Sequence, residues 1–293
     1  ESTSHPVELK NAHVARNMEM VHATVNHPSV CIWSLGNEAG PGDNFVAAYK
    51  AIKAFDTSRP VQYERNNDIV DMGSNQYPPI AWVQGAVKGK YNMKYPYHIS
   101  EYAHSMGNAC GNLIDYWNAI ESTNFFIGGA IWDWVDQSVY RPSDLLRGVR
   151  TKNGFHNWVA GYDYNPTEFV GDGFQGNFLN NGIITPDRAW TAKLTEVKAV
   201  YAPAAFSDWD AATRSFTLRN KLAFSDLSDL YDLSYQLLRD GYVVEQQRFL
   251  SPPCQRVSRH KSPCLTIASS TQVRSMCSTS PCLSLIHISE PTR

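Results

Sequence analysis

A short apolar run that ends beside a glutamate is the feature that most constrains this chain. Within residues 29–42, the Val-Cys-Ile-Trp run has no helical spacing and is short enough for a strand buried on both faces. The run stops at Gly36 and is followed by Asn37 and Glu38. A parallel α/β barrel carries its chemistry on the loops that follow the carboxyl ends of its strands. The pattern predicts a strand at residues 30–33 and a functional carboxylate at Glu38, with an ordinary loop acid as the alternative.

The same arrangement occurs a second time along the chain. A strand pattern at residues 97–100 leads into Glu101 and a loop that contains Gly107. Glu38 and Glu101 are distant in sequence, so only a shared barrel could bring them together. Two carboxyl groups held on either side of one bond are what cleavage of a glycosidic linkage requires.

Alternation of strand and helix patterns organises the first two hundred residues. Strands are predicted at residues 30–33, 61–64, 69–74, 97–100 and 125–131. Helices are predicted at residues 7–27, 44–55, 79–90, 111–122 and 191–201, the second of them capped by Asp43 or Asn44. Such alternation favours an α/β fold with parallel strands and helical crossovers. Five units are too few to close a barrel, so we expect a partial (β/α)8 TIM barrel whose first three units lie upstream.

Changes in sequence pattern divide the chain into three parts. We expect a partial barrel domain at residues 1–202, a second domain at residues 203–250 and a tail at residues 251–293. The second part shows alternating apolar residues and an Asp240-Gly241 turn signal, which predict the start of an all-β sandwich. The tail has no sustained period. It is interpreted as a disordered linker, a disulfide-bearing segment or non-native sequence after a lost reading frame, and the last interpretation is favoured.

Residues 138–180 are rich in glycine and aromatic side chains without a clear period, and they predict a long loop over the top of the barrel. Residues 180–184 are expected to turn into a further short strand.

Bulk composition narrows the classes of function. Hydrophobic residues make up 43% of the chain and charged residues 18%, which is typical of a globular protein. A net charge of −2 gives no reason to expect nucleic acid or an acidic membrane as a partner. Cys31 and Cys110 have apolar or small neighbours and are predicted to be unpaired, buried thiols. The chain begins at Glu1 without a methionine, so we expect a piece of a longer protein and predict no compartment.

Four segments resemble the large β-galactosidases of glycoside hydrolase family 2. They are residues 26–38, 58–64, 101–108 and 128–137, and the resemblance extends over about residues 10–250. The Asn-Glu pair that ends the first segment is shared with the β-glucuronidases and β-mannosidases of the family. The Glu-Tyr-Ala-His and Trp-Asp-Trp-Val-Asp-Gln blocks resemble the galactosidase branch. The resemblance implies barrel strands four to eight followed by the start of an Ig-like domain.

The resemblance also implies roles for individual residues in retaining hydrolysis of terminal β-D-galactosides. Glu38 would be the acid/base and Glu101 the nucleophile that forms a galactosyl-enzyme. Tyr77 resembles a tyrosine that hydrogen-bonds the nucleophile. The residues expected to contact the sugar are Asn37, Tyr77, His104, Met106, Trp132 and Asn181. A loop aromatic at Tyr77, a structural histidine at His104 and core packing at Trp132 are the alternatives.

Metal ions are implied by the resemblance alone. Glu38 resembles a ligand of Mg²⁺, and Phe178, through its carbonyl, and Asn181 resemble two ligands of Na⁺. The remaining ligands belong to parts of the family that precede Glu1. The loop before Phe178 departs from the family's Gly-Gly-Asp-Phe pattern, because this chain has Ala-Gly-Tyr-Asp-Tyr at residues 160–164.

The expected partner is a small galactoside or oligosaccharide, and a homo-oligomeric parent protein is left open. Two other functions remain as alternatives: an inactive carbohydrate-binding homologue, and a β-glucuronidase or β-mannosidase of the same family. Because five strands leave open sheet edges, we expect this chain to be inactive and poorly soluble by itself.

Overall fold

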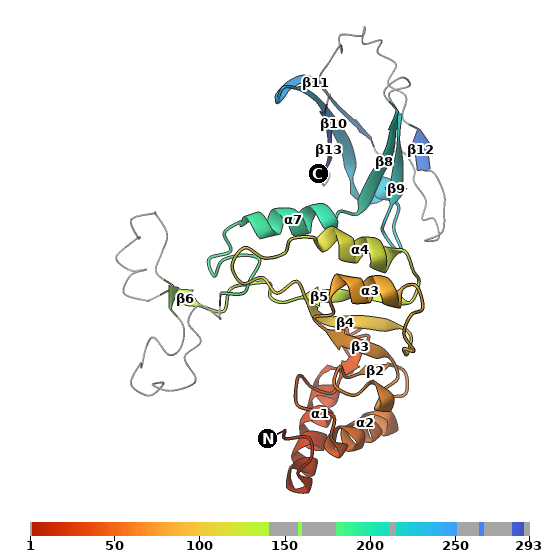
Figure 1. Ribbon diagram of the computed structural model, residues 1–293, viewed down its shortest axis with the longest axis vertical. Helices are drawn as coiled ribbons and strands as arrows, with labels where there is room; N and C mark the ends of the chain where they lie inside the picture. Colours follow the sequence, from red (N-terminus) through yellow and green to blue (C-terminus); the bar gives the residue numbers. More distant parts are fainter. Residues whose placement is uncertain are drawn as a thin grey trace. The chain divides into compact units, whose positions relative to one another are not determined.

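The computed structural model describes residues 2–140, 158–159, 180–210, 215–250, 264–266 and 283–289. The chain divides into two compact units, Glu1–Val200 and Tyr201–Arg293 (Figure 1). The division lies close to the boundary predicted after residue 202. None of the helices in the described ranges has the length and apolar character needed to cross a membrane.

The first unit alternates helices with parallel strands, as the sequence predicts. Its strands are β1 (Trp33–Ser34), β2 (Val61–Gln62), β3 (Gly73–Gln76), β4 (Tyr97–Tyr102) and β5 (Phe126–Ile131). Its helices are η1 (Val7–Leu9), α1 (Lys10–Thr24), α2 (Asp43–Phe55), η2 (Asn67–Ile69), α3 (Ile80–Ala86), α4 (Leu113–Glu121) and α7 (Ala192–Val200). β1 pairs with β2, and β3, β4 and β5 form a second parallel sheet in that order. The described strands do not close into a barrel.

The segment that follows β5 continues the parallel arrangement. Val135 forms an isolated parallel bridge with Ile184, and the amide of Ile184 donates to the carbonyl of Trp134 at 3.1 Å. The short strand predicted at residues 180–184 therefore lies beside the extension of β5. Within the predicted long loop at residues 138–180, the structure describes β6 (Val139–Tyr140) and β7 (Trp158–Val159), which pair antiparallel. Residues 141–157 and 160–179 of that loop lie outside the described residues.

One core of this unit joins β1 and β2 to the first two long helices. Phe45, Ala48 and Ile52 of α2 are buried with Trp33 and Val61, as their helical spacing predicts. Since Trp33 and Val61 face the helices, Ser34 and Gln62 point to the other face of their strands. There the amide nitrogen of Gln62 donates to the hydroxyl of Ser34 at 2.6 Å.

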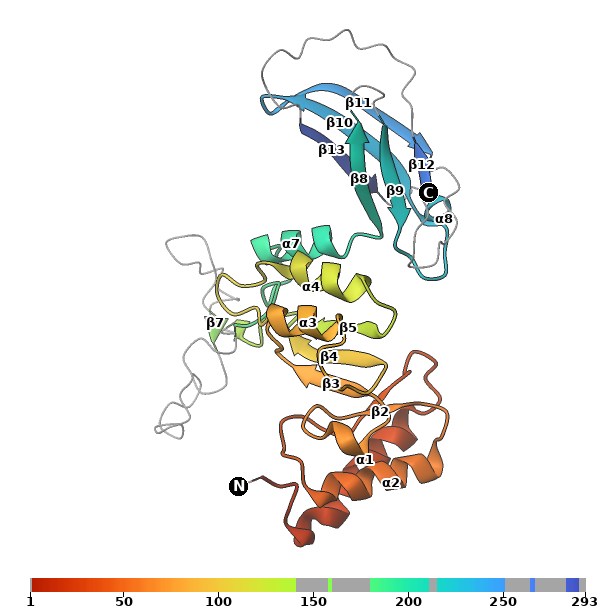
Figure 2. The same ribbon diagram turned by 45° about the vertical axis from the view of Figure 1, so that its right-hand side comes forward.

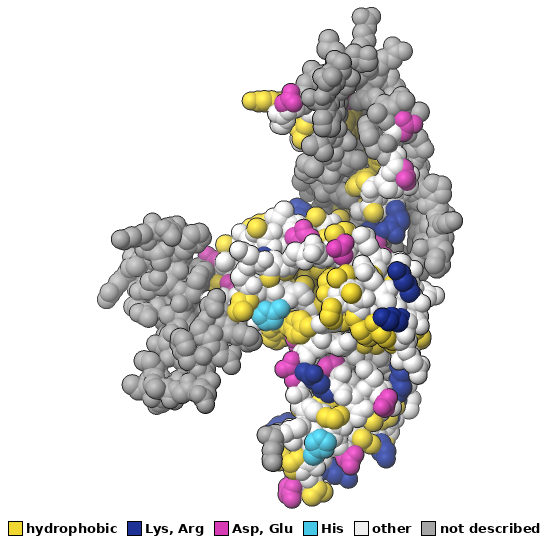
Figure 3. All heavy atoms as spheres, viewed as in Figure 1, with side chains coloured by type: hydrophobic (Ala, Val, Ile, Leu, Met, Phe, Trp, Pro, Cys, Tyr) yellow, Lys and Arg dark blue, Asp and Glu magenta, His cyan; other side chains and the backbone are white. Residues whose placement is uncertain are grey.

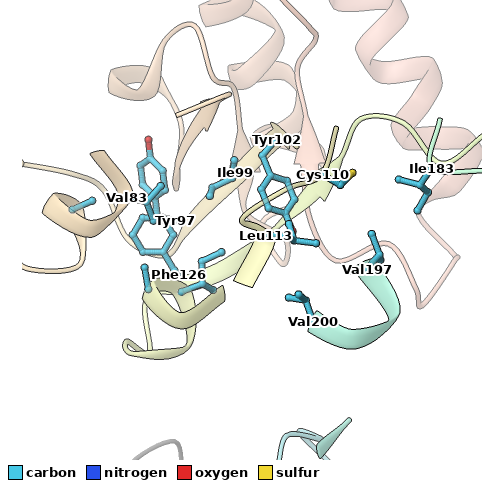
Figure 4. Close-up of a cluster of buried hydrophobic side chains, with 13 residues drawn as sticks. Val83, Tyr97, Ile99, Tyr102, Cys110, Leu113, Phe126, Ile183, Val197 and Val200 are labelled. Carbon is cyan, nitrogen blue, oxygen red and sulfur yellow. The ribbon is translucent and has the colours of Figure 1, made fainter. Parts of the chain in front are cut away.

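A second core lies between the three-stranded sheet and helices α3, α4 and α7. Figure 4 shows side chains of β4 and β5 meeting side chains from these helices, and Figure 2 shows α3 and α4 on one side of the sheet. Ile99 and Phe126 are fully buried at its centre. At the carboxyl ends of the strands, Tyr77 after β3 is exposed, whereas Tyr102 at the end of β4 is buried.

Several predicted details of the first unit are wrong. Cys31 is exposed, because pairing begins only at Trp33, where its amide donates to the carbonyl of Pro60 at 3.0 Å. Residues 30–32 accordingly precede the strand, whereas Cys110 is buried as predicted. The helix predicted at residues 7–27 is shorter, because residues 7–9 form the 3-10 helix η1 and α1 ends at Thr24.

The start of α2 and the position of β3 also differ from the prediction. Gly42 is the N-cap of α2, since Nδ2 of the Asn44 side chain donates instead to the carbonyls of Thr3 and Pro6. The strand predicted at residues 69–74 is displaced to β3, because the side chain of Asn66 caps the 3-10 helix η2.

The second unit is composed mainly of antiparallel strands, as the sequence predicts. Its elements are β8 (Ala204–Asp210), β9 (Ser215–Asn220), α8 (Leu227–Leu230), β10 (Asp232–Arg239), β11 (Tyr242–Leu250), β12 (Cys264–Thr266) and β13 (Leu283–Ser289). They form two three-stranded sheets, ordered β12-β9-β8 and β11-β10-β13. Asp240 and Gly241 both have positive φ, at 49° and 83°, and join β10 to β11, which confirms the predicted hairpin. Of the predicted tail, only β12 and β13 are described, and its origin stays a prediction.

Candidate active site

The two glutamates are carried by the carboxyl ends of β1 and β4. Glu38 lies four residues after the end of β1. Glu101 is next to the last residue of β4 and pairs in register with Gln76 of β3. Tyr77 comes directly after β3, and its amide donates to the carbonyl of Glu101 at 2.7 Å. Parallel pairing therefore sets these residues at the same edge of their sheets, which is the edge where barrels bind ligands.

Tyr77 is bonded to Glu101 through its side chain as well as its backbone. Its hydroxyl donates to Oε2 of Glu101 at 2.7 Å. Burial raises the pKa of Tyr77 far above its usual value, and the Glu101 bond and the negative charges of Glu101, Glu38 and Asp133 raise that pKa further. The phenol therefore stays protonated at neutral pH and remains a hydrogen-bond donor.

A polar network links Glu38 to the loop that contains Tyr77. Nη2 of Arg65 lies 3.6 Å from Oε1 of Glu38 and donates to Oε1 of Gln76 at 3.2 Å. Nε2 of Gln76 donates to Oδ1 of Asn37 at 3.2 Å. The side chains of Asn37, Glu38 and Glu101 are therefore gathered around the ends of β1, β3 and β4.

The backbone turns sharply at each of these strand ends. Glu38, Tyr77 and Ala103 have φ values of 53°, 50° and 50°, in the left-handed region that residues other than glycine seldom occupy. Each such residue costs on the order of 1–3 kcal/mol, and such residues cluster at functional sites. Glu38 and Tyr77 are also exposed, so a ligand could reach them.

The remaining predicted sugar contacts lie on neighbouring loops. The ring of His104 lies 5.9 Å from the ring of Tyr77, between centroids. The amide of Ser105 donates to the carbonyl of Trp132 at 2.8 Å, and Nζ of Lys193 donates to the carbonyl of Ser105 at 2.7 Å. These bonds tie the loop of His104 and Met106 to the segment of Trp132.

Asn181 belongs to the same neighbourhood through its backbone. Its carbonyl accepts from the amide of Asp133 at 2.8 Å. The side chain is 1% exposed, and its Oδ1 has no hydrogen-bond partner among the described residues. Such an orphaned oxygen is a chemically suitable donor to a hard cation.

These residues do not test the metal predictions. Phe178, the other predicted Na⁺ ligand, lies outside the described residues. For Mg²⁺, the described ranges contain no group of three or more His, Cys, Asp or Glu side chains able to hold a metal. Glu38 is the single predicted ligand there and has Arg65 as its neighbour. The described part of the chain does not by itself fit Mg²⁺, and that ion stays a prediction.

Sequence reasoning missed three polar residues at this site. Arg65, Gln76 and Asp133 were not predicted, although Gln76 ends β3 and Asp133 follows β5. Their position after predicted strands was the available signal. It was not decisive, because side chains that follow a strand are usually only solvated.

Parallel strands with helical crossovers, and acidic side chains gathered at their carboxyl ends, define a barrel-type α/β enzyme domain. Residues 1–206 match the model of glycosyl hydrolases family 2, TIM barrel domain, and the chain belongs to that family.

Relatives with assigned names agree with this membership. The chain is 35% identical over 248 residues to a β-galactosidase of Priestia megaterium, covering 83% of the chain and 22% of the relative. It is 36% identical over 251 residues to a β-galactosidase of Vibrio cholerae, covering 81% of the chain and 23% of that relative. The chain thus spans less than a quarter of their length. Among solved structures, a β-glucuronidase of an uncultured Clostridium is 17% identical with a TM-score of 0.40, over 65% of this chain and 35% of that one, which is too distant to carry an argument.

Proposed function

We propose that the protein containing this chain is a retaining β-galactosidase that cleaves terminal β-D-galactosides by double displacement. The observation that supports this most is the environment of the Tyr77 hydroxyl. It donates to Glu101 at 2.7 Å, and Gln76, the residue before Tyr77, accepts from Arg65, whose guanidinium lies 3.6 Å from Glu38. Retaining glycosidases need two carboxyl groups about 5–5.5 Å apart. The similarity to named β-galactosidases selects the sugar.

In the first step, Glu101 attacks the anomeric carbon and forms a galactosyl ester. Glu38 gives its proton to the departing glycosidic oxygen at the same time. The hydrogen bond from the Tyr77 hydroxyl to Oε2 fixes the orientation of the Glu101 carboxylate during this attack. Asn37, oriented by Gln76, would bond a sugar hydroxyl.

In the second step, Glu38 acts as the base that removes a proton from water. The water oxygen attacks the anomeric carbon, and the bond to Glu101 breaks, which returns the electron pair to the carboxylate. The Tyr77 hydroxyl then stabilises the carboxylate that is released. His104, Met106 and Trp132 would surround the sugar from the neighbouring loops.

We further propose that β1 to β5 correspond to barrel strands four to eight, and that residues 203–250 begin an Ig-like sandwich. The parallel order of β3, β4 and β5 supports the first part, and the antiparallel β8 to β11 support the second. A barrel half has open edges and an uncovered inner face. This chain alone is therefore proposed to be inactive, and its activity belongs to the longer protein.

Sodium is proposed at Asn181 because its buried Oδ1 lacks a partner in the described part of the chain. When bound, the ion would supply positive charge near sugar hydroxyls. Asn181→Leu in the full-length protein should abolish Na⁺-dependent protection against thermal unfolding. Protection equal to that of the wild type would exclude Asn181 as a ligand.

The experiment that tests the function uses the full-length protein and a nitrophenyl galactoside. Glu38→Gln and Glu101→Gln should each lower turnover by several orders of magnitude, whereas Glu19→Gln, at an exposed ion pair with Arg16 on α1, should have no effect. A 2-fluoro galactoside with a good leaving group should label Glu101 covalently.

Near-normal rates from either site variant would refute the assignment. Binding of galactose without turnover by the wild type would favour a binding homologue instead. Turnover of a glucuronide or mannoside in preference to the galactoside would change the sugar.

A further inference from the structure

A second carboxylate lies directly behind Glu38 and is used by nothing described so far. Glu64 follows β2, and its side chain is only 3% exposed. Its Oε1 accepts the backbone N–H of Glu38 at 2.8 Å. A buried carboxylate loses hydration, so it is found where hydrogen bonds and charge compensate that loss.

The hydrogen bond to Glu64 is donated by the backbone N–H of Glu38, a residue whose backbone conformation is strained. Glu38 has a φ of 53°, a left-handed conformation that an L-residue adopts only when its surroundings hold it there. A charge-assisted bond from a backbone N–H to a carboxylate is short and strong compared with neutral bonds. Glu64 therefore fixes the peptide that precedes the Glu38 side chain.

Arg65 completes the arrangement. Its Nε lies 3.5 Å from Oε1 of Glu64, and its Nη2 lies 3.6 Å from Oε1 of Glu38. One guanidinium thus balances two carboxylates. Because the Arg65 side chain is partly exposed, its charge is screened, and the direct bond from Glu64 is the firmer restraint on Glu38.

We propose that Glu64 is a positioning residue that sets the direction in which Glu38 delivers its proton. This inference rests on the proposed function, because it assigns Glu38 the role of acid. It assigns Glu64 no contact with the substrate. It also gives a role to the segment at residues 58–64, whose resemblance to the family otherwise carries no chemistry.

The inference predicts a dependence on the leaving group. An alkyl galactoside or lactose has a poor leaving group and needs protonation, whereas a dinitrophenyl galactoside departs without it. The value of kcat/KM reports the step in which this departure occurs. A misdirected Glu38 should therefore slow the first kind of substrate and spare the second.

Three variants of the full-length protein distinguish the effect of side-chain length at residue 64 from the effect of its charge. Glu64→Asp keeps the charge but withdraws the carboxylate by one methylene, and Glu64→Leu removes the acceptor. Both should lower kcat/KM for lactose by about 10- to 100-fold, the loss expected for one charge-assisted bond, and change that for the dinitrophenyl galactoside by less than about threefold. Glu64→Gln keeps an acceptor oxygen within reach and should restore most of the lactose activity.

Asp71→Asn is the matched control. Asp71 accepts the backbone N–H of Val61 at 2.9 Å, at the opposite end of β2 from Glu64. This variant should lower thermal stability without a leaving-group dependence.

Two results would overturn the inference while leaving the proposed function intact. They are equal losses on both substrates, or wild-type activity on lactose in Glu64→Asp, in a protein whose Glu101 is still labelled. If Glu64→Leu fails to fold, Glu64→Asp and Glu64→Gln decide the matter. A wild type without galactosidase activity would overturn the proposed function, and the inference with it.

Discussion

Tyr77→Phe removes one hydroxyl and leaves the ring in place, so it isolates the bond to Glu101. A hydrogen bond to a charged group contributes about 1.5–3 kcal/mol. Tyr77 is 38% exposed, so water can replace part of that bond, and the lower end of the range applies. A loss of about 1.5–2 kcal/mol in the transition state corresponds to a decrease of roughly 10- to 30-fold in rate.

The decrease should be largest where the galactosyl-enzyme breaks down, because Glu101 regains its full negative charge in that step. For a dinitrophenyl galactoside, whose departure is fast, kcat of the full-length Tyr77→Phe variant should fall by this factor. Single-turnover measurements should show the galactosyl-enzyme accumulating to a larger fraction than in the wild type.

Tyr49→Phe is the matched control for this variant. Its hydroxyl donates to Oδ1 of Asp71 at 2.7 Å, the same kind of bond at the same length. The Asp71 hydrogen bond, and after it burial, raise the pKa of Tyr49 to about 12. This variant should lose about 1.5–2 kcal/mol of stability and keep its kcat. If Tyr77→Phe turns over as fast as the wild type, the Tyr77–Glu101 bond has no catalytic role and the reasoning is refuted.

The remaining predictions concern stability. Asp56→Ala should cost about 3–5 kcal/mol in denaturant titrations, since it strips a buried carboxylate from three side-chain donors and leaves Arg59 uncompensated; a loss below about 1 kcal/mol would contradict this. Hydrogen bonds from Ser58, Arg59 and Trp33 hold the pKa of Asp56 far below its usual 3.8. The ionised carboxylate therefore stabilises the fold fully above pH 3.8, and this contribution is lost as the pH falls through the lowered pKa. The Asp56→Ala variant should lack this acid-sensitive contribution to the free energy of unfolding. Gly182→Ala should lower the melting temperature, because a Cβ there would lie 2.1 Å from the backbone nitrogen of Asp136, whereas Gly111→Ala, with nothing within 4 Å, should not; equal melting temperatures would show that the loop yields.

Much of the architecture could be predicted from periodicity. The buried face of α2 follows directly from apolar spacing, because burial on one face imposes that spacing. The predicted start of β4 at Tyr97 is confirmed, although the strand continues to Tyr102 and does not end at residue 100. The hairpin at Asp240-Gly241 was predictable because both residues tolerate positive φ. Local sequence patterns were sufficient wherever the structure of an element depends on its own residues and not on distant partners.

Features that depend on distant partners could not be predicted in this way. The length of β1 depends on where β2 begins to pair, so the exposure of Cys31 was missed. The positions of Glu38 and Glu101 at strand ends were predictable. The hydrogen bond from Glu38 to Glu64 and the ion pair between Arg65 and Glu38 were not, because they join the end of one strand to the loop after another, and no sequence spacing encodes that contact.

The central claim is that Glu38 and Glu101 face each other across one sugar. A crystal structure of the full-length protein with a 2-fluoro galactosyl group attached tests this most directly. The account predicts an ester on Glu101 and a Glu38 carboxyl about 5–5.5 Å from that of Glu101. Carboxyl groups separated by more than about 6.5 Å, or an ester on any other residue, would contradict it.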